Sequence, residues 1–179
     1  MNVLDYAPLG AALLGAAMVV GAVAQGRSRL MLWLALLASV WVLLWLTLGI
    51  SFGDGGGTGL NLTPFQEIRR ALDNRGGATS INLVGNVIMF VPVGALVAWI
   101  SRRGRVLAAT SVGLLLSVAI EATQLSLGRV GDIDDVILNT AGAFLGGLIA
   151  VAWTAIVGGR RAGYDEPRAS SSVGRAADF

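Results

Sequence analysis

Acidic side chains and one arginine stand close together in a stretch of the chain that has apolar residues on both sides. Residues 121–142 read EATQLSLGRVGDIDDVILNTAG and contain Glu121, Gln124, Arg129, Asp132, Asp134, Asp135 and Asn139. Carboxylates can hold hydroxyls or amines, can transfer protons, and can bind Mg²⁺ or Ca²⁺ through their oxygens. An arginine binds phosphate or carboxylate groups. This stretch is therefore the first candidate for a binding or catalytic site.

The residue types that are missing narrow the chemistry further. The chain has no cysteine and no histidine, and all of its basic residues are arginine. A disulfide, a thiolate nucleophile, an imidazole base and the usual zinc sites are therefore excluded. Any chemistry must use carboxylates, arginines, amides, hydroxyls or the backbone.

The composition is that of a membrane protein. Of the 179 residues, 55% are hydrophobic and 13% are charged, whereas a soluble domain has about 25% charged residues. The mean hydropathy is +0.72. Nucleic acid is not an expected partner, because the net charge of +2 is spread over the flanks of apolar segments and is not gathered into a patch.

Apolar segments of about 20 residues can cross a membrane as helices, and the chain has five of them. They span residues 7–24, 30–50, 81–100, 106–127 and 136–157. The predicted fold is all-α, a polytopic bundle that forms one transmembrane domain over residues 1–157. Residues 158–179 are predicted to be a disordered cytoplasmic tail. The first segment has no leading arginine, so we interpret it as a membrane helix and not as a cleaved signal peptide.

The arginines predict the orientation of the bundle. With five helices, three arginine-containing places share one side of the membrane: residues 27–29, 102–105 and 160–161. The positive-inside rule makes this side the cytoplasm, with the N-terminus outside and the C-terminus inside. Arg69, Arg70 and Arg75, in the loop on the opposite side, are evidence against this orientation.

Polar residues of three predicted helices fall at one membrane face, because neighbouring helices run antiparallel. Residues three or four apart share a helix surface, and on this spacing they pair as Asn82 with Asn86, Glu121 with Gln124, and Asp135 with Asn139. The spacing predicts a polar pocket, one to two helical turns deep, at that face.

Glycines predict where the helices approach one another closely. The run GAFLG at 142–146 has the spacing of close helix crossings. Other glycines within the predicted helices are Gly85, Gly94, Gly113 and Gly147. Pro92 lies midway along the third predicted helix and is expected to kink it for packing.

Three motifs carry a resemblance to a known family. They are LNLTPFQEI at 60–68, NLVGNVIMFVPVGALV at 82–97 and EATQLSLGRVGDIDDVILNTAGAFLG at 121–146. In order and spacing they resemble the VanZ-like family of small bacterial membrane proteins, over roughly residues 60–150. The resemblance implies a multi-pass α-helical protein of the bacterial cytoplasmic (inner) membrane. The founding member of the family is associated with low-level resistance to the lipoglycopeptide antibiotic teicoplanin, an association that supplies no reaction.

The favoured hypothesis is a site that binds an envelope lipid or a lipid-linked precursor by its headgroup at the outer face. Its ligand-binding residues would be Asn82, Asn86, Glu121, Gln124, Arg129, Asp132, Asp134, Asp135 and Asn139. Arg129, with Arg69 or Arg70, would contact phosphate or a carboxylate, and the acids would hold hydroxyls or amines. The turn that contains Asn61, Pro64 and Phe65 would lie at the membrane interface as an anchor or lid.

Three alternatives stay open. In a carboxylate-dependent hydrolase or transferase, Glu121 would be the catalytic acid or base, and the aspartates could hold a divalent ion. The aspartate spacing matches no metal loop, however, so no metal and no cofactor is predicted, and we expect Asp134 or Asp135 to cap the last helix instead.

In a purely structural protein, the amides would link helices and Arg129 would pair with Asp132 or Asp134. A transporter is disfavoured, because the polar residues gather at one face. The sequence does not indicate the oligomeric state.

Overall fold

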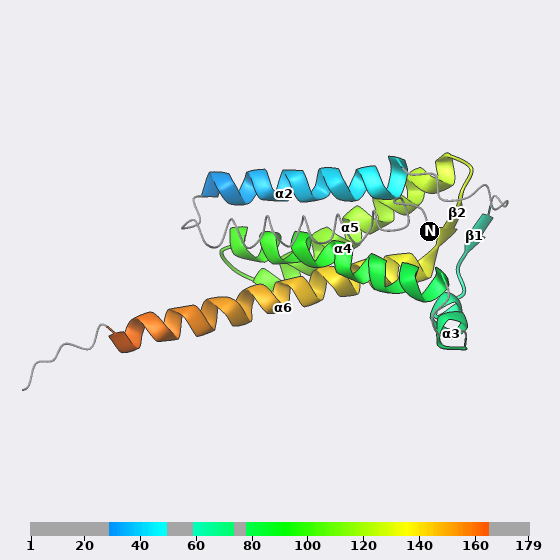
Figure 1. Ribbon diagram of the computed structural model, residues 1–179. Coiled ribbons are helices and arrows are strands. Elements are labelled where there is room, and N and C mark those ends of the chain that lie inside the picture. The colour runs from blue at the N-terminus through cyan, green and yellow to red at the C-terminus, as the bar shows by residue number, and fades with distance from the viewer. Residues whose placement is uncertain (1–28, 50–58, 74–77, 165–179) are drawn as a thin grey trace, which may run out of the picture.

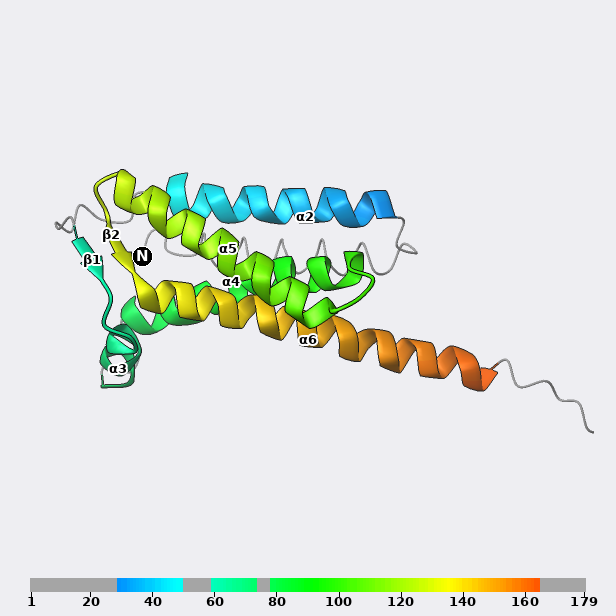
Figure 2. The same ribbon diagram turned by 180° about the vertical axis from the view of Figure 1, so that it is seen from behind.

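Four long helices form the body of the part of the chain that the structure describes. The computed structural model describes residues 29–49, 59–73 and 78–164, with the side chains of residues 49, 78–82 and 158–164 left out. The long helices are α2 (Arg29–Leu44), α4 (Ala78–Ile100), α5 (Arg105–Ser126) and α6 (Ile133–Tyr164). A short π-helical segment, η2 (Trp45–Gly49), continues α2. The four helices run side by side in both views (Figures 1 and 2).

The helices confirm the predicted all-α membrane fold. In the described part of the chain, four segments are long and apolar enough to cross a membrane: Arg29–Leu48, Leu83–Ile100, Arg105–Ser126 and Ile133–Val157. They correspond to four of the five predicted spans, and the predicted span over residues 7–24 lies outside the described residues. Helix α6 continues to Tyr164, so residues 158–164 of the predicted tail are helical. The orientation of the bundle stays a prediction.

Three short elements gather at one end of the bundle (Figures 1 and 2). Strand β1 (Gly59–Asn61) pairs in parallel with β2 (Val130–Asp132), so that Leu60 lies opposite Gly131. Helix α3 (Gln66–Asp73) follows β1. The pairing of these two strands was not predicted from the sequence.

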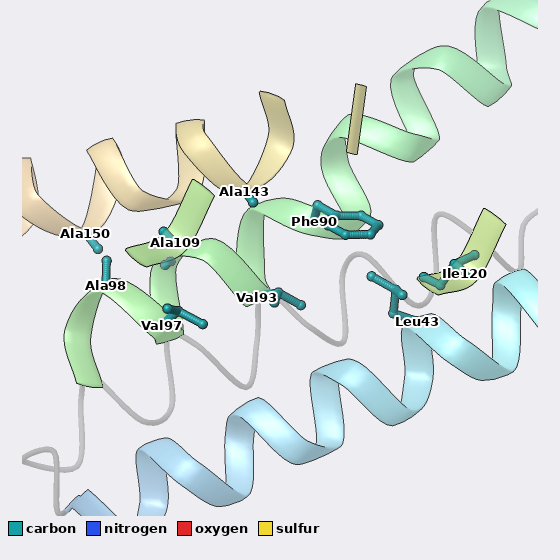
Figure 3. Packing of buried hydrophobic residues seen from close by; sticks show 10 residues of the cluster. Leu43, Phe90, Val93, Val97, Ala98, Ala109, Ile120, Ala143 and Ala150 are labelled. Atoms are coloured by element: carbon teal, nitrogen blue, oxygen red, sulfur yellow. The ribbon is translucent and has the colours of Figure 1, made fainter. Parts of the chain in front are cut away.

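Helix α4 lies at the centre of the apolar core. Its buried face includes Phe90, Val93 and Ala98, none of which is exposed. Figure 3 shows these side chains among others from α2, α5 and α6. The helix continues without a break through Pro92, which is itself buried.

Glycines bring the backbones of α4 and α6 into direct contact, as predicted for GAFLG. A Cβ atom added at Gly142 would lie 2.2 Å from the carbonyl oxygen of Val87. One added at Gly146 would lie 2.1 Å from the carbonyl oxygen of Val91. Close contacts across helices also occur at Gly94, Gly113 and Gly147. At Gly85 the predicted close approach is not seen among the described residues, where an added Cβ would meet nothing within 4 Å.

The difference in packing between Gly142 and Gly85 can be tested by replacing each glycine with alanine. Gly142→Ala forces a methyl group into the Val87 backbone and should destabilise the protein by about 1–3 kcal/mol, the usual cost of overpacking. Gly85→Ala adds a methyl group where no described residue lies within 4 Å, and it should leave stability equal or raise it by about 0.5–1 kcal/mol. Thermal unfolding in detergent measures both, and equal melting temperatures for the two variants would contradict the packing of α4 on α6.

Candidate functional site

Hydrogen bonds join Asn61, Glu121, Asp132 and Asp134 into one network, and the separate pairs Asn86–Asp135 and Asn139–Ser117 complete a single polar cluster. It lies where α5 ends and α6 begins, at the same end of the bundle as β1, β2 and α3 (Figures 1 and 2). We call this set the polar cluster and define it as Asn61, Asn86, Glu121, Asp132, Asp134, Asp135 and Asn139. The acids of the polar cluster differ in how many of their carboxylate oxygens accept a hydrogen bond from the protein.

The carboxylate of Asp134 holds the start of α3. Its side chain is fully buried in the first turn of α6. One oxygen accepts a hydrogen bond from the backbone N–H of Phe65, and the other accepts one from the N–H of Glu67 at 2.8 Å. A carboxylate satisfies unpaired N–H groups at a helix N-terminus and complements the helix dipole. Asp134 therefore caps α3, and the prediction that it could cap its own helix was wrong.

Asp132 caps α6 instead. It stands just before the helix, and its Oδ1 accepts the N–H of Asp134 at 2.8 Å. Its Oδ2 accepts a hydrogen bond from Asn61 Nδ2 at 3.0 Å. Both oxygens of Asp132, like both oxygens of Asp134, are thus engaged within the protein. These two aspartates tie the 59–67 segment to the start of α6.

The turn before α3 is strained and partly exposed. Phe65 has a φ of 63°, a left-handed conformation that costs a bulky residue roughly 1–2 kcal/mol. The hydrogen bond from its N–H to Asp134 holds it there. Its side chain is 49% exposed, and Pro64 beside it is also exposed. The predicted interface turn therefore presents an aromatic side chain at the end of the bundle.

Among the described residues, Glu121 and Asp135 each keep one carboxylate oxygen that accepts no hydrogen bond. Glu121 is 9% exposed, and its Oε2 accepts the N–H of Asp132 at 2.8 Å. Asp135 accepts a hydrogen bond from Asn86 Nδ2 through Oδ1. Glu121 Oε1 and Asp135 Oδ2 accept no hydrogen bond from any described residue. The two carboxyl groups lie within Coulombic range of each other.

Asn139 lies one turn deeper in α6 than Asp135. Its Nδ2 donates to Ser117 Oγ at 2.9 Å. The side chain is 4% exposed, and its Oδ1 is buried without a hydrogen-bond partner among the described residues. An unsatisfied buried acceptor costs about 1–3 kcal/mol.

Arg129 and Gln124 face η2 and not the acids. Arg129 donates to the carbonyl oxygen of Thr47 at 2.8 Å, and Gln124 Nε2 donates to the same oxygen at 3.1 Å. Within the described residues, Arg129 forms no ion pair, so the alternative in which it pairs with Asp132 or Asp134 was wrong. Glu121 and Gln124 were predicted to share one helix surface, but their side chains contact different partners. Glu121 accepts the N–H of Asp132, and Gln124 donates to Thr47. The ion pair that the structure does contain joins Arg70 to Glu67 in α3.

Asn82 lies in α4, but its side chain is outside the description. Metal binding by the aspartates finds no geometric support in the described residues, where no group of three or more Asp, Glu, His or Cys side chains could hold an ion.

Sequence reasoning missed three contributors to this end of the bundle. Ser117 precedes Glu121 by one helical turn, so the i, i+4 rule could have found it. The carbonyl of Thr47 and the N–H of Glu67 are backbone groups brought in by the tertiary fold. No side-chain pattern marks either of them.

The clamp by Asp134 can be tested with the conservative variant Asp134→Asn. An amide accepts through one atom only, so at least one charge-assisted hydrogen bond of about 1.5–3 kcal/mol is lost. We expect the amide protons of Phe65 and Glu67 to exchange with deuterium at least about tenfold faster, since 1.4 kcal/mol is a factor of ten. Asp73→Asn makes the same change at an exposed carboxyl of α3 and should leave these rates unaltered. Wild-type exchange rates in Asp134→Asn would refute the clamp.

Comparison with known proteins identifies the family. A family model described as VanZ/LLP1 matches residues 29–154, which run from the start of α2 into α6. The match confirms the resemblance seen in residues 60–150 and extends it to the second predicted span. Comparisons with curated proteins and with solved structures found no match. The chain belongs to the VanZ/LLP1 family and, by its four long apolar helices, is a membrane protein of that family.

Proposed function

We propose that the polar cluster, with Arg129, binds the headgroup of an envelope lipid or lipid-linked precursor. The observation that carries this proposal is the presence of unused polar atoms on Glu121, Asp135 and Arg129, at one end of a bundle of apolar helices. Charged side chains in membrane helices are costly and usually serve a function. On the orientation predicted from the arginines, this end faces the outer leaflet of the bacterial cytoplasmic membrane.

Arg129 is the group best suited to a phosphate. A guanidinium has five N–H donors in a planar fork that matches phosphate oxygens. Among the described residues, one nitrogen of Arg129, Nη1, is in use and donates to the carbonyl oxygen of Thr47. The residue is half-buried and lies within Coulombic range of Glu121. A phosphate at Arg129 would therefore lie near the unused carboxylate oxygens.

Exposed apolar side chains beside the cluster support a lipid as the ligand. Leu60 in β1, Leu62 and Phe65 are 57%, 63% and 49% exposed. Leu127, just before β2, and Val130, the first residue of β2, are exposed as well. An aromatic and aliphatic rim suits the interface between headgroups and acyl chains. A lipid could thus place its headgroup at the cluster and its chains along this rim.

Asp132 and Asp134 have a smaller role in this proposal than the sequence suggested, because their oxygens are occupied by protein donors. They shape the site and do not contact the ligand. The described hydrogen bond of Glu121 is with a backbone N–H, so among the described residues no nucleophile or second catalytic side chain is hydrogen-bonded to it. A relation to teicoplanin resistance enters the proposal through the family alone.

Native mass spectrometry of the protein released gently from its own membranes tests the proposal. We expect wild type to retain a phosphorylated lipid and Arg129→Gln to lose it at least about tenfold, as follows from the loss of one charge-assisted contact of 1.5–3 kcal/mol. Arg129→Lys keeps the charge and a donor for Thr47 but lacks the fork, and should retain an intermediate amount. Arg103→Gln, an exposed arginine at the other end of the bundle, is the matched control. Identical lipid adducts in Arg129→Gln and Arg103→Gln would contradict a headgroup site at Arg129.

A further inference from the structure

The unused atoms of the cluster define the headgroup more closely. Resting on the proposed function, we infer that the headgroup carries a primary ammonium group, held between Glu121 and Asp135, beside the phosphate at Arg129. The ligand class is then a zwitterionic phospholipid with a free amine, of the phosphoethanolamine type. Three features of the cluster support this inference: its geometry, its hydrogen-bond balance and its charge.

The facing surfaces of α5 and α6 place Glu121 and Asp135 opposite each other. A Cβ added at Gly113 would lie 2.3 Å from the Cβ of Ala143, which fixes one contact between the helices. One turn further along α5, Ser117 accepts its hydrogen bond from Asn139. Because the helices are antiparallel, the next turn brings together Glu121 and Asp135. The seam thus runs through three pairs: Gly113 with Ala143, Ser117 with Asn139, and Glu121 with Asp135.

Around Glu121 and Asp135, the described residues present hydrogen-bond acceptors that no described donor satisfies. Glu121 Oε1 and Asp135 Oδ2 accept no hydrogen bond from the described residues. Asn139 Oδ1, one turn deeper on the same strip as Asp135, is buried and equally without a partner. A primary ammonium has three N–H donors and no acceptor, so it complements such a set. A hydroxyl brings one donor together with lone pairs that would face the carboxylate oxygens.

The charge of the cluster also favours a cation. Asp132 and Asp135 lie within Coulombic range of Glu121, and Arg129 is the described cation in that range. Arg129 donates to a backbone carbonyl and forms no ion pair with these acids. Carboxylates removed from bulk water need an opposite charge close by. An ammonium between Glu121 and Asp135 supplies it, while Arg129 keeps its remaining donors for the phosphate.

A series of lipids with the same acyl chains and the same phosphate separates the contribution of the ammonium group from that of the phosphate. The delipidated full-length protein is titrated with phosphatidylethanolamine, with its N-methylated derivatives up to phosphatidylcholine, and with phosphatidylglycerol. Methylation preserves the positive charge and removes the N–H donors one by one. We expect wild type to bind phosphatidylethanolamine at least tenfold more tightly than phosphatidylcholine or phosphatidylglycerol, with affinity falling at each methylation.

Variants assign the preference to the two carboxyl groups. Asp135→Asn and Glu121→Gln should each reduce the preference for phosphatidylethanolamine at least tenfold and leave the affinity for phosphatidylglycerol unchanged. Asp73→Asn should bind as wild type does. Equal binding of all the lipids by wild type, abolished in Arg129→Gln, would overturn the ammonium site and leave the phosphate site standing. Failure of wild type to bind any of the lipids would overturn both. The wild-type series decides the question even if a variant fails to fold.

Discussion

The buried carboxylate of Asp134 is the constraint on which this end of the protein depends. A fully buried charge is tolerated when both of its oxygens are hydrogen-bonded, and the donors here are N–H groups of Phe65 and Glu67. These groups belong to a segment that precedes α4, so the bond joins parts of the chain that two membrane helices separate. From Asp134 the connections pass through Asp132 to Asn61 and to Glu121. A change at this carboxylate is therefore expected to reach the candidate ligand-binding oxygens.

The bundle divides into a tightly packed apolar part and a polar end. In the packed part, Gly142 and Gly146 let α6 lie directly on the backbone of α4. In the polar end, the same helices carry Asn86, Asp135 and Asn139. Close packing below the cluster fixes the positions of these side chains, and a binding site needs such rigid support. The exposed Leu62 and Phe65 lie beside this rigid part and contribute apolar surface at its edge.

Much of this arrangement could be predicted from the sequence, because it depends on local patterns. Apolar length predicted the four described spans, and their antiparallel order predicted that Asn86, Glu121 and Asp135 share one face. Contacts between distant segments could not be predicted. The parallel pairing of β1 with β2 involves only three residues on each strand and leaves no alternating pattern. The capping pattern around Asp134 correctly indicated a helix N-terminus, but which helix it caps depends on the tertiary fold. Arg129 has several acids near it in sequence, yet it donates to the carbonyl of Thr47, a backbone group that no sequence motif marks.

The distance between the turn before α3 and the segment before β2 tests the clamp most directly. The chain has no cysteine, so Leu62→Cys and Leu127→Cys, both at exposed positions, can each carry a spin label without further changes. Double electron–electron resonance in lipid discs should give one narrow distance distribution in the otherwise native protein. With Asp134→Asn added, we expect the distribution to broaden or shift, while Asp73→Asn leaves it narrow. An unchanged narrow distribution in Asp134→Asn would contradict the role of this carboxylate in holding the 59–67 segment against the start of α6.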